Sequence, residues 1–102
     1  MLENLTHATF QPLVGQQFCI HISPEQSVDV ELLEARPFPA APMRDGKSRT
    51  RDPFSLLFRG SKTVRLPQRI YGVEHAAFGR ADIFLVPLGP DAAGERYEAV
   101  FN

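Results

Sequence analysis

Apolar residues alternate with polar ones along most of this chain, with a period of two. Seven glycines and nine prolines interrupt the pattern at intervals. Such alternation is typical of short β-strands with one buried face, whereas an amphipathic helix repeats its apolar residues every three or four positions. Because no stretch shows a sustained helical repeat, the sequence predicts an all-β fold.

Six strands are predicted, each with a row of apolar residues on its inward face. Their approximate bounds are Gln16 to Ile22, Val28 to Ala35, Pro53 to Arg59, Arg69 to His75, Asp82 to Leu88 and Glu95 to Phe101. The adjacent pair Leu32 and Leu33 breaks the alternation in the second strand. This break indicates either a β-bulge or a strand that is covered on both faces near its end.

Six short antiparallel strands favour a small closed barrel or a compact sandwich. At 102 residues, the chain has room for one β domain with one core, spanning residues 1–102. The segment from Leu5 to Val14 is expected to form a helical turn capped by Thr6. Phe10, Leu13 and Val14 would then close one end of the barrel.

The longest stretch without alternation runs from about Arg36 to Asp52 and is predicted to be an irregular loop. Three prolines in its first half favour extended, solvated backbone. Four basic residues lie in its second half: Arg44, Lys47, Arg49 and Arg51. The loop either grips an acidic or phosphate-rich surface or is a solvated connection, and the interspersed Asp45 and Asp52 favour the second interpretation.

Charge and composition indicate which partners and which compartment are expected. The formal net charge is -1, and nucleic-acid binding usually needs an excess of Lys and Arg, so a nucleic-acid partner is disfavoured. The single cysteine, Cys19, permits no intramolecular disulfide. The first residues do not resemble a signal peptide, and the apolar stretch Ile83 to Leu88 is too short to cross a membrane. Cytoplasmic localisation without a membrane anchor is therefore expected.

The sequence contains no recognised catalytic, cofactor-binding or metal-binding motif. His7, His21 and His75 lack metal-ligand spacing and are interpreted as structural residues. Cys19 and His21 share one strand face, but nothing beside them indicates the environment that a nucleophilic cysteine needs. No cofactor is expected. An enzyme is disfavoured, and Cys19 and His75 are its remaining candidate residues.

The predicted fifth strand has no polar face. Its apolar residues form two alternating rows, Ile83 with Leu85 and Phe84 with Val86 and Leu88. One row must therefore face away from the barrel interior, where it is a candidate interface for a partner protein or a second copy of the chain. Cover by Phe10, Leu13 and Phe38 is the competing explanation.

Several landmarks of the chain resemble those of a known family. They are Phe10-x-x-Leu13-x-Gly15-x-x-Phe18, the segment from Pro53 to Gly60, Gln68-x-x-Tyr71-x-x-x-His75, Phe84-x-x-Pro87 and the ending from Tyr97 to Asn102. In these the chain resembles a family of bacterial domains of similar length and unknown function, over nearly its whole length. The resemblance implies that the gene of this chain lies in a cluster that also encodes phage-tail-collar-like proteins. It implies no catalytic residues.

Two classes of function stay open. The favoured one is a non-enzymatic protein-interaction or assembly subunit, with contacts through Phe84 and Val86; the resemblance implies a phage-tail-like structure as its setting. The alternative is a small-ligand-binding barrel, with a mouth lined by Arg59, Gln68, Tyr71 and His75. Because small barrels usually fill their interior with side chains, the sequence favours the first class.

Overall fold

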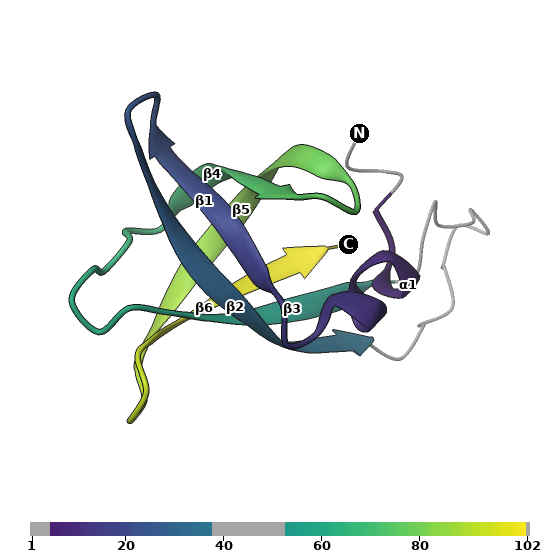
Figure 1. Ribbon diagram of the computed structural model, residues 1–102. Coiled ribbons are helices and arrows are strands. Elements are labelled where there is room, and N and C mark those ends of the chain that lie inside the picture. The colour runs from purple at the N-terminus through teal and green to yellow at the C-terminus, as the bar shows by residue number, and fades with distance from the viewer. Residues whose placement is uncertain (1–4, 38–52, 102) are drawn as a thin grey trace, which may run out of the picture.

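Six antiparallel strands and one short helix make up the computed structural model, which describes residues 5–37 and 53–101 (Figure 1). The strands close into a barrel in the order β1-β2-β3-β6-β5-β4, and β4 pairs back with β1. Their bounds are β1 Gln17–Ser23, β2 Gln26–Pro37, β3 Phe54–Gly60, β4 Arg69–His75, β5 Gly79–Pro90 and β6 Glu95–Phe101. The all-β prediction is confirmed, and the chain forms the closed barrel.

The barrel consists of two halves with equal strand lengths. In each half, β1-β2-β3 and β4-β5-β6, strands of 7, 12 and 7 residues follow one another. The long middle strand of each half contains a bulge with a leucine as the extra residue, Leu33 in β2 and Leu88 in β5. A bulge bends its strand and increases the local twist. The break in alternation at Leu32 and Leu33 is therefore a bulge.

The inward rows of the strands meet in a densely packed core. Their buried apolar side chains are at most 9% exposed: Phe18, Ile20, Val30, Leu32, Ala35, Phe54, Leu56, Phe58, Tyr71, Val73, Ile83, Leu85, Tyr97, Ala99 and Phe101. Because these side chains fill the interior, the barrel is a closed scaffold and its outer surface is left to provide contacts.

The helix α1 (His7–Phe10) and the 3-10 turn η2 (Gln11–Leu13) close one end of the barrel. At the start of α1, the backbone N–H of Thr6 donates to Oγ1 of Thr9 at 3.0 Å. Phe10 and Leu13 are buried as predicted, but Val14 is 38% exposed, so its predicted place in the plug is wrong. Val14 follows η2 with extended backbone, which carries it away from the core. The helices of the described segments are too short and too polar to span a membrane.

Both long strands extend beyond their predicted bounds. β2 continues through Pro37, so the predicted start of the irregular loop at Arg36 is wrong. Strand pairing with β3 outweighs the local preference of a proline-rich segment, and Arg36 pairs with Glu34 at 2.6 Å. The rest of the predicted loop, residues 38–52, lies outside the described residues. β5 likewise runs to Pro90, where it pairs with Glu95.

Candidate functional site

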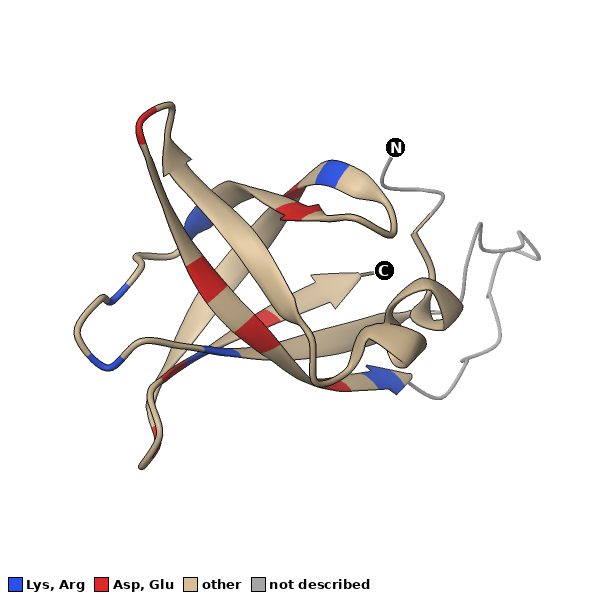
Figure 2. Cartoon of the chain, viewed as in Figure 1, with Lys and Arg blue, Asp and Glu red and all other residues tan. Residues whose placement is uncertain are grey.

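The outer surface of the barrel differs between its two sides. Figure 2 shows acidic residues spaced along β2, where Asp29, Glu31 and Glu34 are exposed. On β4, β5 and β6, by contrast, four large apolar side chains are exposed: Ile70 by 61%, Phe84 by 47%, Leu88 by 42% and Val100 by 50%. We call these four residues, together with the half-buried Val86, the outer apolar face.

The alternation of β5 produces the central part of this face. Ile83 and Leu85 point into the core, so Phe84 points outward. Phe84 lies directly opposite Ile70 of β4 in the antiparallel register, a spacing at which side chains on neighbouring strands make contact. Val86 continues the outward row and lies opposite Glu98 of β6.

The prediction that one row of the fifth strand faces away from the interior is therefore confirmed. The competing explanation named three residues as cover for this row. Phe10 and Leu13 lie in the core, whereas Phe84 is 47% exposed on the outer surface, so these two residues do not cover it. Phe38, the third, lies outside the described residues.

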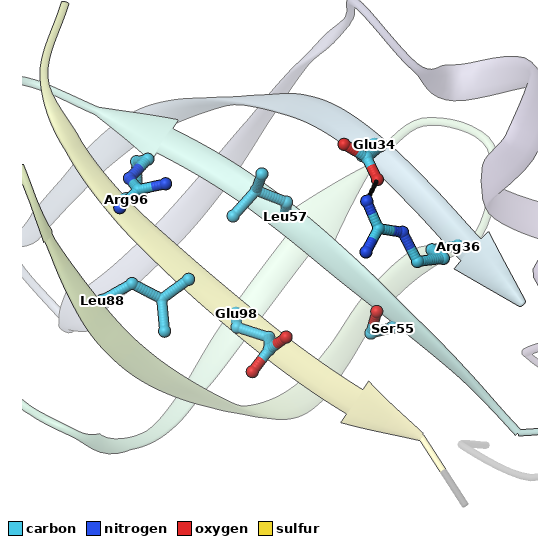
Figure 3. A pocket seen from close by; sticks show the side chains of 7 residues that line it. All are labelled: Glu34, Arg36, Ser55, Leu57, Leu88, Arg96 and Glu98. Carbon is cyan, nitrogen blue, oxygen red and sulfur yellow. Dashed lines mark ion pairs between the residues drawn. The ribbon is translucent and has the colours of Figure 1, made fainter. Parts of the chain in front are cut away.

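A pocket of about 180 Å³ lies next to the apolar face, over the outer surfaces of β2, β3, β6 and β5 (Figure 3). It is lined by Glu34, Arg36, Ser55, Leu57, Leu88, Arg96 and Glu98. Figure 3 shows the Leu57 side chain between Arg96 on one side and the ion pair of Glu34 with Arg36 on the other. Two leucines thus form the apolar part of the pocket, and two acidic and two basic side chains surround them.

The predicted ligand-mouth residues do not surround one opening. Arg59 and Gln68 lie at the end of the barrel where β3 ends and β4 begins. Tyr71 is buried inside the barrel, where its hydroxyl donates to the carbonyl of Pro67 at 2.6 Å and burial raises its pKa. His75 lies at the far end of β4, beside the aromatic rings that surround α1.

The hydrogen bonds of His75 assign it a structural role. Its Nε2 donates to Oε1 of Gln16 at 2.8 Å, and its Nδ1 accepts the backbone N–H of Ala77 at 2.9 Å. This pair of partners matches a neutral imidazole with its proton on Nε2. Both ring nitrogens are used within the chain, as expected for a histidine that holds a turn.

Arg59 is fixed by Asp91 in the loop between β5 and β6. Its Nε and Nη2 donate to Oδ2 of Asp91 at 3.0 and 2.7 Å. The other carboxylate oxygen accepts the backbone N–H groups of Ala93 and Gly94. The guanidinium hydrogen bonds and these backbone hydrogen bonds together lower the pKa of Asp91 to about 2. The pair therefore organises the loop.

Comparison with known proteins identifies the family of this chain. A model of a domain of unknown function matches residues 5–101. The chain belongs to this family, DUF6916. The match confirms a family of unknown function over nearly the whole chain. No curated protein and no solved structure matches it.

The Arg59–Asp91 pair of this DUF6916 domain predicts an acid-sensitive contribution to stability. Because the folded-state pKa of Asp91 lies below the unfolded value of about 4, the contribution is present above pH 4 and is lost as the pH falls to about 2. The difference in free energy of unfolding between wild type and Asp91→Asn should therefore shrink across this range in urea titrations. Arg59→Gln should show the same trend, and a pH-independent difference would contradict the assignment.

The polar side of the DUF6916 barrel contains Cys19, which is half-buried on β1. Nε2 of the nearby His21 donates to Oε1 of Glu74 at 2.7 Å. Among residues 5–37 and 53–101, no group of three or more His, Cys, Asp and Glu side chains is arranged to hold a metal ion.

Cys19→Ser is expected to change the free energy of unfolding by less than about 2 kcal/mol, because the side chain lies outside the core. Urea unfolding monitored by circular dichroism measures the change. A larger loss would show that the thiol contributes to packing.

Sequence reasoning found Phe84 and Val86 but missed their neighbours on the DUF6916 barrel. Ile70 could have been found, because the inward positions of Tyr71 and Val73 place it on the opposite face of the strand. The pocket and the role of Leu57 in it could not have been found, because the pocket forms only once the order of neighbouring strands is known.

Proposed function

We propose that this domain is a non-enzymatic protein-interaction or assembly subunit that docks through its outer apolar face. The observation that carries the proposal is the exposure of Ile70, Phe84 and Val100 on one side of a barrel whose core is already filled. A large apolar side chain left in water forgoes about 1.5–3 kcal/mol relative to full burial. Clusters of such residues on a small domain are typical of protein interfaces.

The two equal halves of the barrel support this interpretation. Phe84 is the sixth residue of β5, and the sixth residue of β2 is Glu31. Their neighbours Ile83 and Val30 are both buried. The fold therefore accepts a glutamate at this position of a long strand, so the exposed phenyl ring of Phe84 is not a requirement of the barrel. A contact with a partner explains its presence.

The proposal includes a phage-tail-like assembly as the setting of this subunit, because the sequence resemblance implies it. The alternative, a small-ligand-binding barrel, has less support. The interior is filled by side chains, and Gln68 precedes the first residue of β4 whereas His75 is its last.

Photo-cross-linking in the native host tests the proposal. A benzophenone amino acid replaces Ile70 in one variant and Asp29, on the polar side, in a matched control. We expect a discrete adduct from position 70, none from position 29, and loss of the adduct when Phe84→Asp is added. Equal adducts from both positions, or none from position 70 in a folded variant, would contradict the proposal.

A further inference from the structure

We propose that the partner of the outer apolar face is a second copy of this chain, in a twofold-symmetric dimer where the Phe84 ring of each copy enters the Leu57–Leu88 pocket of the other. This inference rests on the proposed function, because it uses the same face. It adds the identity of the partner and the contact that holds it.

The spacing along β5 provides the symmetry. Strand residues rise by about 3.3 Å each, so Phe84 and Leu88 lie roughly 13 Å apart, with Val86 halfway between them. A twofold axis that lies between the two docked faces, parallel to them and perpendicular to β5 at the level of Val86, exchanges the two positions. Phe84 of one copy then lies over Leu88 of the other, and the reverse contact forms at the same time, as in any isologous interface.

The pocket has the volume for an aromatic ring, and two leucines lie in its lining. Its volume is about 180 Å³, and an apolar cavity of about 150 Å³ in another protein holds benzene. Leu57 and Leu88 offer apolar contact to the ring. Phe84 is 47% exposed, so half of its side chain already projects from the barrel.

The charges around the pocket suit contact between identical surfaces. A face of one sign would repel its own copy, as the surface around Asp29 and Glu31 of β2 would. The pocket rim instead has two acidic residues, Glu34 and Glu98, and two basic ones, Arg36 and Arg96. The formal net charge of -1 adds little long-range repulsion.

Sedimentation equilibrium of the purified protein over a wide concentration range tests the inference. We expect the mass of two copies for the wild type. Phe84→Asp removes the ring and Leu57→Trp fills the pocket, and each should raise the dissociation constant about 30-fold or more. Val64→Asp changes a side chain that is 37% exposed in the 61–68 connection and should leave the constant unchanged. Thermal unfolding shows whether each variant is folded.

Mixing two variants tests the contact itself. Phe84→Ala keeps the pocket and Leu57→Trp keeps the ring, so their mixture restores one of the two contacts. We expect a heterodimer from the mixture under conditions where each folded variant alone is a monomer. If the wild type dimerises but Leu57→Trp does not weaken it and the mixture does not associate, the inference is wrong.

A monomeric wild type at its highest soluble concentration also overturns the inference. If position 70 still forms an adduct of foreign mass in the host, the partner is another protein and the proposed function stands. If position 70 forms no adduct, both proposals fail together.

Discussion

Replacing Phe10 with alanine is expected to lower the free energy of unfolding by about 3–5 kcal/mol. Phe10 is fully buried, and its ring centroid lies between 5.4 and 6.4 Å from those of Phe18, Phe54, Phe78 and Phe101. The loss combines the transfer of a phenyl group with the cavity that it leaves at the end of the barrel. Small domains are stable by only about 5–15 kcal/mol, so the variant should be close to unfolding at 37 °C.

Urea unfolding at 25 °C measures this effect, with Val14→Ala as the control. Val14 lies four residues further along the same segment but is 38% exposed, so its truncation should change the free energy of unfolding by no more than about 0.5 kcal/mol. Similar values for the two variants would show that α1 only rests on the barrel and does not complete its core.

The strands of this fold could be predicted because apolar residues alternate with polar ones along most of their inward rows. Phe54, Leu56 and Phe58 of β3 are all fully buried, as their spacing indicates. The ends of β2 and β5 could not be predicted in the same way. Pro37 at the end of β2, and Gly89 with Pro90 at the end of β5, favour a loop locally. Pairing with β3 and β6 nevertheless keeps these segments extended. Such pairing is a long-range property that local composition does not contain.

The candidate site shows the same division. The outward row of β5 follows from period-two alternation alone, so Phe84 and Val86 could be named from the sequence. The pocket requires β3 to lie beside β6, which brings Leu57 opposite Glu98. It also requires the bulge at Leu88. The glycine and proline that follow Leu88 are typical of a strand end, so the sequence predicted that the strand stops there. Register and bulges arise from the closure of the whole barrel, so this part of the site became visible only in the structure.

Gly94→Ala is expected to lower the free energy of unfolding by about 3 kcal/mol, the upper range for a side chain that does not fit. A Cβ at this position would lie 2.0 Å from the carbonyl oxygen of Gly60. Backbone atoms cannot rotate away, so the pairing of Gly60 with Glu95 at the end of β3 and β6 must open. The shift would also displace the backbone N–H that Gly94 donates to Asp91.

Gly79→Ala is the matched control for this prediction. Gly79 has a φ of 83°, a left-handed conformation that costs a non-glycine residue about 1–2 kcal/mol. A Cβ there would meet nothing within 4 Å, so strain of the backbone is the whole expected effect. Urea unfolding of both variants separates a steric clash from a conformational cost. A Gly94→Ala loss no larger than that of Gly79→Ala would mean that the loop between β5 and β6 can move away from β3 without opening the barrel.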